Sequence, residues 1–335
     1  MPVTLKQLAA RAGVHPSTIS RVVNRDPGLR IAPETRARIE ALIAETGYRP
    51  NGVARSLKLR QTFVVAVVIP DVTNPLFAGI FRGVEDVALT RGYNVILCNT
   101  DNLHQREASH LESLHARRVD GVILASATLA DPSVARLRQL RIPFVLVNRY
   151  SDTRHAFVGS DDLLGGRLAT EHLLSLGHRR IAHLAGSQKV STALLRRRGY
   201  LEALKRAGLE PDPSLIVDGG FTEELGARAM ERLLALPQPP TAIFAVNDMA
   251  AVGAQTVLAR RGLRIPGDVS IVGYNDVPLV SRLHPPLTTI RVPPVRFGQT
   301  SAEILFEQLE TGSASSRRVV FQPELVIRAS TGAPG

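Results

Sequence analysis

The chain is poor in the residues that would cross-link it or carry it through a membrane. Its 335 residues include no Trp, one Cys and three Met, and aromatic residues make up 4%. A single cysteine excludes an intrachain disulfide framework, and Cys98, at the end of the apolar run 93–97, is predicted to be a small buried hydrophobe. No apolar stretch is long enough to cross a bilayer. Because the N-terminus opens on a polar amphipathic pattern rather than a signal peptide, we expect a cytoplasmic protein.

Motifs of several enzyme and metal classes are also missing. A dinucleotide site would need the pattern G-x-G-x-x-G after the first strand expected beyond the N-terminal region, but residues 70–75 at that place do not match it. Neither a P-loop nor the Gly-x-Ser-x-Gly motif of hydrolases occurs. The nine histidines show no metal-ligand spacing, and His178 is assigned a structural role. The sequence therefore predicts no catalysis, no cofactor and no metal.

Positive charge is concentrated near the N-terminus. The formal net charge is +11; residues 1–60 hold 11 Lys+Arg against 4 Asp+Glu, whereas the other 275 residues hold 30 against 26. Such a basic head is typical of contact with nucleic-acid phosphates. A solvated basic face in an arginine-rich chain is the alternative, but the gradient favours nucleic acid. Hydrophobic residues, at 44%, suffice for a small module and a core-bearing region that could divide in two.

Residues 4–48 predict three short helices. Thr4 and Gln7 form a Thr-x-x-Gln capping box for the first helix, and Gly13 allows the turn that follows it. Pro16 and Pro33 lie at first helical positions of the second and third helices. The residues expected to pack inward are Leu5, Leu8, Ala9, Ile19, Val22, Val23, Ile39, Leu42 and Ile43.

The second helix carries small polar groups and one arginine on its outer face. Ser17, Ser20 and Arg21 point away from the expected core, and arginine is the residue best suited to a bidentate contact with guanine. The helix, turn and helix suit a second helix lying in the major groove of DNA. A three-helix bundle without any ligand is the alternative.

The segment Val14–Asn24, followed by Gly47–Asn51 and Ala54–Leu57, resembles the lactose-repressor (LacI/GalR) family of bacterial transcription regulators, and the similarity covers essentially the whole chain. This resemblance implies that base edges of DNA are contacted by Pro16, Ser17 and Arg21. It implies that phosphates are held by Thr4, His15, Thr18, Ser20, Asn24 and Thr35. One departure is Ala32, since relatives often cap the third helix with Ser or Thr.

Residues 49–62 are by themselves a basic linker, too short to form a stable isolated helix. The family resemblance implies a hinge helix that folds on DNA and pairs with its twin in a dimer. Leu57 would then wedge into the minor groove and bend the duplex, while Asn51 and Arg55 would meet the backbone. Ordering of this linker would couple the head, residues 1–48, to the conformation of the body, residues 63–335.

The body alternates strands and helices, which is typical of doubly wound parallel sheets. Strands are predicted over 63–69, 93–98, 121–124, 144–147, 181–184, 242–246, 269–272 and 324–327. Helices are predicted over 77–91, 105–117, 133–139, 163–176, 194–207, 223–236, 249–261 and 298–309. Because the series restarts, we expect two lobes joined by three crossings, as in the periplasmic sugar-binding fold it resembles. Lobe one would span about 63–161 plus 292–319, and lobe two about 162–291 plus 320–330.

Amides, an arginine and aromatic residues follow the predicted strands, where ligands of such sheets bind. This mixture suits a polyhydroxylated ligand, although ordinary turn formers and helix caps are an alternative for each single residue. The family resemblance places an effector cleft at Asn74, Phe77, Ser126, Asn148, Arg196, Phe221, Asn247 and Asn275. At positions 148 and 275 many sugar-responsive relatives carry Asp. The loss of two negative charges beside Arg196 leads us to expect a sugar acid or another small anion.

The sequence thus predicts a homodimeric transcription regulator, most simply a repressor, whose affinity for operator DNA is controlled by a sugar or sugar acid. A free solute-binding protein is the alternative, but it has no need of the first 24 residues. An architectural DNA-binding protein has no use for a two-lobed body. The sign of regulation, the operator and the effector stay open, and so does the choice between dimer and tetramer.

Overall fold

The computed structural model describes residues 3–23, 28–48, 61–152 and 154–335. The chain forms two compact units, Met1–Thr62 and Phe63–Gly335. Along the described segments no helix is long and apolar enough to cross a membrane.

The first unit contains three helices, α1 Leu5–Ala12, α2 Pro16–Val23 and α3 Pro33–Thr46. The expected capping box is present: the backbone N–H of Gln7 donates to Thr4 Oγ1, and the Thr4 N–H donates to Gln7 Oε1. Gly13 adopts the left-handed conformation, with φ 64°, at the turn after α1. Leu8, Ile19 and Ile39 are fully buried and form the centre of this small core.

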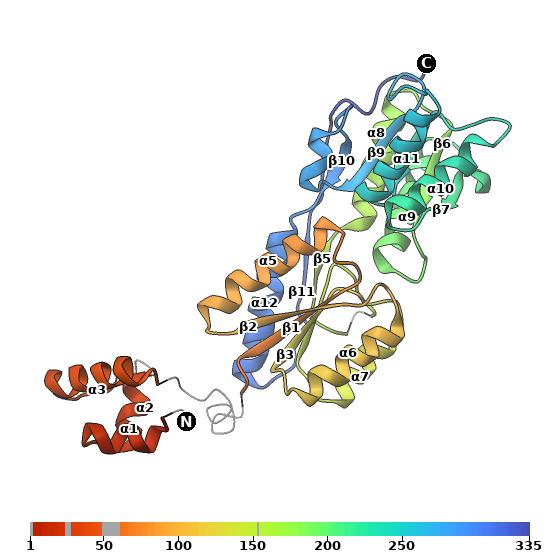
Figure 1. Ribbon diagram of the computed structural model, residues 1–335. Coiled ribbons are helices and arrows are strands. Elements are labelled where there is room, and N and C mark those ends of the chain that lie inside the picture. Colours follow the sequence, from red (N-terminus) through yellow and green to blue (C-terminus); the bar gives the residue numbers. More distant parts are fainter. Residues whose placement is uncertain (1–2, 24–27, 49–60, 153) are drawn as a thin grey trace. The chain divides into compact units, whose positions relative to one another are not determined.

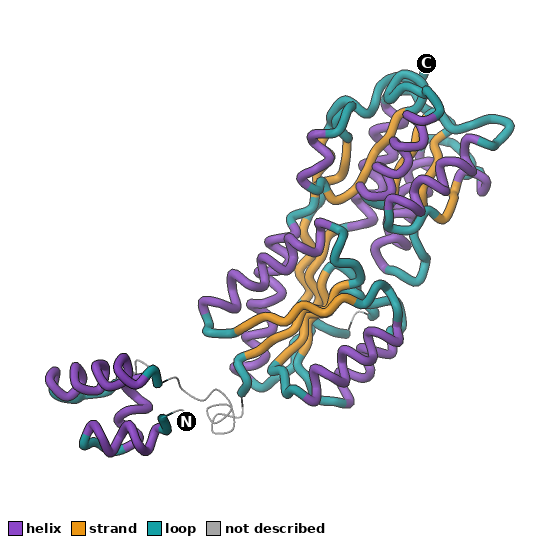
Figure 2. Tube along the Cα trace, viewed as in Figure 1, coloured by secondary structure: helices purple, strands orange, loops and turns teal. Residues whose placement is uncertain are grey.

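The second unit holds two six-stranded sheets, each covered by helices on both faces (Figures 1 and 2). In lobe one the strand order is β11-β5-β4-β3-β1-β2, and all neighbours are parallel. Its strands are β1 Val64–Ile69, β2 Asn94–Asn99, β3 Gly121–Leu124, β4 Phe144–Val147, β5 Phe157–Ser160 and β11 Arg318–Phe321. Helices α5 Pro75–Thr90 and α12 Pro294–Thr311 pack together on one face, and α6 His104–Ala116 and α7 Pro132–Gln139 on the other (Figure 1).

Lobe two repeats this plan with the strand order β12-β10-β9-β8-β6-β7. Its strands are β6 Ile181–Ala185, β7 Ile216–Asp218, β8 Ala242–Ala245, β9 Ser270–Asn275, β10 Thr288–Arg291 and β12 Glu324–Val326. Its α-helices are α8 Asp162–Ser175, α9 Ser191–Arg206, α10 Glu223–Leu234 and α11 Asp248–Arg260, and short 3-10 helices span Pro213–Leu215 and Pro278–Arg282. The α8–α9 and α10–α11 pairs pack tightly. The chain passes between the lobes after β5, after β10 and after β11.

This architecture confirms the predicted fold class, with some corrections. Strand β12 pairs antiparallel with β10, so lobe two is not wholly parallel. The boundary expected between residues 319 and 320 falls inside β11, which pairs with β5 up to Phe321. Strands β5, β7, β10 and β11 were not predicted; each has only three or four residues, and its ladder partner lies elsewhere in the chain. Cys98 is buried, as expected.

Candidate functional site

The exposed side of α2 carries the residues expected to reach base edges. Ile19 and Val22 are buried against α1 and α3, whereas Ser17 and Arg21 are exposed and Pro16 is half-buried. The start of α2 is held locally, because His15 Nδ1 lies 2.7 Å from Ser17 Oγ and accepts the Ser17 N–H at 3.3 Å. An exposed helical face of this kind can enter a major groove.

The residues expected to hold phosphates are less uniform. His15 and Thr4 are exposed, but Thr4 also serves the capping box of α1. Thr18, Ser20 and Thr35 are half-buried. The remaining residues of the predicted DNA contact, Asn24, Asn51, Arg55 and Leu57, lie outside the described residues.

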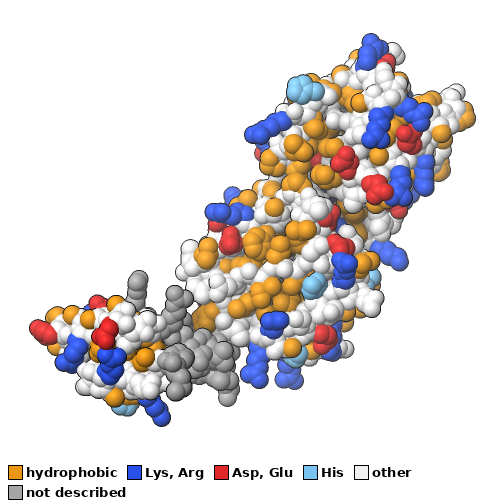
Figure 3. All heavy atoms as spheres, in the orientation of Figure 1, with side chains coloured by type: hydrophobic (Ala, Val, Ile, Leu, Met, Phe, Trp, Pro, Cys, Tyr) orange, Lys and Arg blue, Asp and Glu red, His pale blue; other side chains and the backbone are white. Residues whose placement is uncertain are grey.

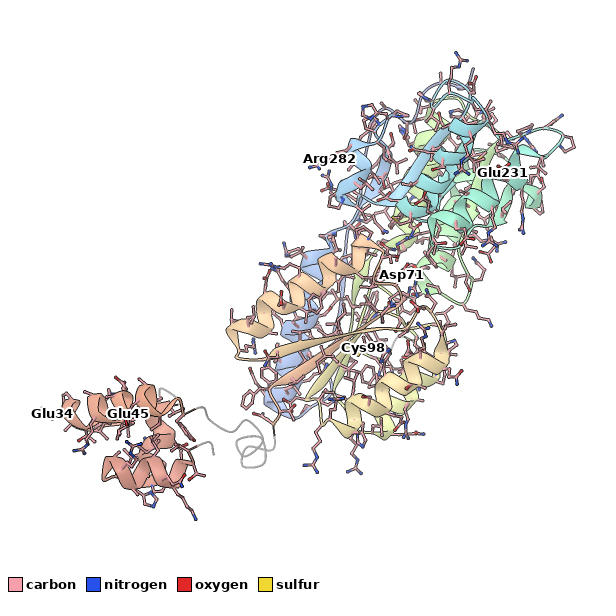
Figure 4. The ribbon with its side chains drawn as sticks, viewed as in Figure 1. Glu34, Glu45, Asp71, Cys98, Glu231 and Arg282 are labelled. Carbon is pink, nitrogen blue, oxygen red and sulfur yellow. The ribbon has the colours of Figure 1, made fainter. Side chains whose placement is uncertain are left out.

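A cavity of about 420 Å³ lies between the two lobes, at the carboxyl ends of their strands. Lobe one contributes residues after β1, β3 and β4 together with the starts of α5 and α6; lobe two contributes the segments after β6 and β7. Asp71, two residues after β1, lies at the end of lobe one that faces lobe two (Figure 4). The position and the volume of this cavity are typical of a small-molecule binding site.

Four of the eight residues predicted for the effector cleft line this cavity: Asn74, Phe77, Ser126 and Phe221. Asn74 also caps α5, since its Oδ1 accepts the Leu76 N–H at 3.1 Å. Phe77 comes from lobe one and Phe221 from lobe two, so each lobe supplies an aromatic side chain to the cavity. Apolar ring faces with polar groups between them are suited to a ligand that has both C–H and O–H surfaces.

Arg149 also lines the cavity, although it was not among the predicted residues. It is 3% exposed; its Nη1 donates to Asn102 Oδ1 at 3.0 Å, and its Nε has no partner within the described part of the chain. Its guanidinium carbon lies 5.0 Å from the centre of the Phe221 ring. Burial, followed by the neighbouring charge of Arg196, lowers the pKa of Arg149 to about 10, so it stays cationic at neutral pH. The signal was available, since Arg149 directly follows Asn148 at the end of β4.

Glu107 was missed as well. It is 3% exposed in the first turn of α6, lines the cavity and accepts the hydroxyl hydrogen of Ser126 through Oε2. Its Oε1 has no partner among the described residues, and burial raises its pKa. The sequence carries no sign of this role, because a glutamate in an amphipathic helix normally faces solvent. Two residues of the cavity lining, Arg149 and Glu107, therefore each keep one buried polar atom without a hydrogen-bond partner among the described residues.

Arg196 does not line this cavity, and it has a carboxylate of its own. Asp162 Oδ1 lies 2.7 Å from Arg196 Nη2, and both side chains are almost fully buried. Arg196 Nη1 donates to the Val246 carbonyl at 2.7 Å, and the guanidinium carbon of Arg196 lies 3.6 Å from the centre of the Tyr274 ring. The expectation of an anionic ligand assumed that the charge of Arg196 was uncompensated, and Asp162 removes that premise.

The other predicted cleft residues, Asn148, Asn247 and Asn275, are buried outside the cavity lining. Asn247 caps α11 by accepting the Ala250 N–H at 2.9 Å, and its Nδ2 donates to the Phe221 carbonyl at 2.9 Å. Asn247 therefore positions an aromatic wall of the cavity. Asn148 and Asn275 have φ 63° and 118°, which asparagine tolerates better than most residues.

Comparison with known proteins places this geometry in a family. Residues 4–51 match bacterial regulatory proteins of the lacI family, and residues 170–331 match the periplasmic binding protein-like domain. The ribose operon repressor of Escherichia coli (strain K12) is 38% identical over 98% of this chain and 99% of its own length. This chain belongs to the LacI family. As a LacI-family member it is a DNA-binding transcriptional regulator and not an enzyme.

Solved LacI-family structures share the fold. A Lac repressor dimer bound to operator and the anti-inducer ONPF is 30% identical, with a TM-score of 0.87 over 99% of this chain and 100% of that one. A LacI-family regulator from Enterococcus faecium with bound ribose is 32% identical, with a TM-score of 0.72 over 80% of this chain and 98% of that one. Both support the assignment of the two lobes to one ligand-binding body.

Proposed function

We propose that this LacI-family regulator is a cytoplasmic repressor that binds a near-palindromic operator as a homodimer, and that a neutral sugar in the inter-lobe cavity controls its affinity for DNA. Two-fold symmetry of the protein would match that of the operator. A repressor similar over nearly its whole length and an operator-bound relative support the DNA partner. Linkage between the two ligands is reciprocal, so operator DNA must change the affinity for the sugar by the same factor by which the sugar changes the affinity for operator DNA.

The exposed face of α2 supports the proposal that Pro16, Ser17 and Arg21 read bases. Thr4, His15, Thr18, Ser20, Asn24 and Thr35 keep their proposed role at phosphates. In the hinge, Asn51 and Arg55 keep their proposed contacts with the DNA backbone, and Leu57 its proposed role as a wedge in the minor groove. The hinge would join residues 1–48, the head, to residues 63–335, the effector-binding body. Ligand-dependent ordering of this hinge is the step that would connect cavity and operator.

Arg21→Ala is expected to weaken specific operator binding by roughly 1–3 kcal/mol and to relax the sequence preference at one base pair, because a bidentate contact to guanine is lost. Binding titrations against the operator and its single-base variants measure both effects. Arg38→Ala, which removes the same charge from an exposed position on α3, is expected to leave the base preference intact. An equal loss on every duplex would contradict base reading by Arg21.

The preference for a neutral ligand is carried by one observation: Arg149 and Glu107 line the same cavity, and each keeps one buried polar atom without a hydrogen-bond partner among the described residues. A sugar hydroxyl can accept from the first and donate to the second. Asp71 and Asp218 also line the cavity, so carboxylates outnumber the cations Arg149 and Lys189 and disfavour an anion. The ribose named for two relatives is the first ligand to test.

Calorimetry with ribose and its aldonate, ribonate, tests this choice. Ribose is expected to bind more tightly, and Arg149→Met is expected to weaken it about 10-fold to 100-fold, because one hydrogen bond to a charged group is lost. Lys189→Met removes the same charge from an exposed cavity residue and is expected to change ribose binding little. Tighter binding of ribonate, weakened by both variants, would establish an anionic effector instead.

A further inference from the structure

A second cavity, of about 370 Å³, lies at the other edge of the lobe-one sheet, where the strands begin. It is bordered by the connection from α7 to β4, the residue before β5 and the end of α12. It shares no lining residue with the inter-lobe cavity. Strand β4 joins the two, because Phe144 at its start lines the second cavity and Arg149, just beyond its end, lines the first.

Arg141 borders this cavity in a backbone conformation that is costly for arginine. Its φ is 56°, in the left-handed region, two residues after Gln139, the last residue of α7. The corresponding residue is glycine after α5, α8, α9 and α11 (Gly92, Gly177, Gly208 and Gly262), and it is an arginine after α6, where Arg118 also has φ 56°. Glycine adopts this conformation without the steric penalty that a Cβ brings. Of the two arginines that bear this cost, Arg141 borders the cavity and Arg118 does not.

Two arginines of the lining, Arg138 and Arg141, form no ion pair within the described part of the chain. Neighbouring arginines do: Arg136 Nε lies 2.7 Å from Glu112 Oε1, and Arg154 Nη2 lies 2.7 Å from Asp152 Oδ2. No carboxylate lines the cavity among the described residues. Two cations at one concave surface without a counter-charge are suited to an anionic group.

The floor of the cavity is apolar and partly aromatic. Phe144 and His155 lie with ring centres 5.1 Å apart, beside Ile142 and Leu309. Burial lowers the pKa of His155, so its ring is uncharged at neutral pH, although Asp152 Oδ1 lies 3.7 Å away. The cations are therefore both on the arginine side, and the floor offers apolar contact area.

We propose that this cavity is a second small-molecule site, which binds an amphiphilic anion: a carboxylate, sulfonate or phosphate carried on an apolar or aromatic body. Arg138 and Arg141 bind the charged group, and the Phe144 side of the cavity takes the apolar body. Figure 3 shows Lys and Arg side chains gathered at the end of lobe one where α6 and α7 end. The hollow with an apolar floor favours a small molecule over the phosphates of a DNA duplex, which would need only an exposed basic face.

Fluorescence titration of the full chain with anilinonaphthalene sulfonate tests the proposal, because this probe carries an anion on aromatic rings. Arg141→Gly is expected to weaken probe binding about 10-fold. The same substitution is expected to raise the Tm of the body, because glycine relieves the left-handed backbone. A merely structural role for Arg141 predicts the opposite change in Tm and no change in probe binding.

Arg118→Gly is the matched control. Arg118 has the same φ of 56° after α6, but it does not line the cavity. Its replacement is expected to leave probe binding unchanged. Phenylnaphthylamine, which has the same rings without the sulfonate, is expected to bind more weakly than the sulfonate. Equal binding of the two probes, equal effects of the two variants, or a loss confined to duplex DNA binding in Arg141→Gly would each overturn the proposal.

Discussion

Replacing Asp162 by alanine is expected to lower the free energy of unfolding of the body by about 3–5 kcal/mol. Its partner Arg196 is 3% exposed, and the ion pair has donor–acceptor distances of 2.7 and 2.8 Å. Without the carboxylate, a buried guanidinium would keep the Val246 carbonyl and the Tyr274 ring as its partners among the described residues. Urea unfolding followed by circular dichroism measures the difference.

The control lies on α9, the helix that carries Arg196. Glu202→Ala removes the partner of Arg198, an i,i+4 pair at 3.0 Å whose side chains are 66% and 32% exposed, and is expected to cost about 0.3–0.5 kcal/mol. Adding Arg196→Met to Asp162→Ala should recover much of the lost stability, since the uncompensated charge is removed. If Asp162→Ala lowered the free energy of unfolding by no more than Glu202→Ala does, solvent would reach Arg196 and the Asp162–Arg196 pair would not stabilise the fold.

Why these two residues meet is visible in the helices that carry them. α8 and α9 approach so closely that a Cβ on Gly166 would lie 2.3 Å from the Arg196 carbonyl oxygen, and one on Gly199 would lie 2.2 Å from that of Leu163. Both helices were predicted from their patterns, but the pairing of Asp162 with Arg196 was not. A pattern locates helices, whereas the partner of a charge depends on which helices cross and at which residues.

Among the strands, too, some could be predicted from their own composition and others could not. The β-branched run of β1 predicted a buried central strand, and it is buried from Val65 onward. The polar strand Thr288–Arg291 was not predicted, because its buried threonines are satisfied by residues far along the chain: Thr289 Oγ1 donates to Asp248, and Thr288 accepts the Arg328 N–H. Short strands of this kind depend on neighbours in the sheet rather than on their own composition.

For the cavity, strand-end reasoning identified the edge of the sheets but not every side chain that uses it. Ser126 and Phe221 line the cavity because strand ends converge there. Asn247 comes after a strand end as well, yet it is occupied with α11 and the Phe221 carbonyl. Sequence position determines which edge a residue occupies, and the backbone groups around it determine whether its side chain remains available to a ligand.

The stability of the body is expected to fall as pH rises from about 4 to about 6, through the titration of Asp248. This carboxyl is fully buried; Oδ1 accepts from Thr289 Oγ1 at 2.6 Å, and Oδ2 accepts the Val277 N–H at 2.9 Å. Burial raises its pKa from 3.8 to about 6, against these hydrogen bonds. Between the two values the folded state holds more protons than the unfolded state, so the contribution is complete below pH 3.8 and is lost as pH rises through 6. This contribution of Asp248 to the free energy of unfolding is about 3 kcal/mol.

Asp248→Asn removes this titration, so the difference in unfolding free energy between the parent protein and the variant should shift by about 3 kcal/mol in favour of the variant between pH 4 and pH 7. Urea unfolding at intervals of pH measures it. Asp268→Asn should show the opposite sign: the Arg264 side chain lowers the pKa of Asp268 to about 2, so the parent loses its advantage only as pH falls below 4. If the difference for Asp248→Asn were constant with pH, the carboxyl would titrate alike in the folded and unfolded chain. Water would then have to reach the start of α11, directly beside the asparagine that holds the Phe221 wall of the effector cavity.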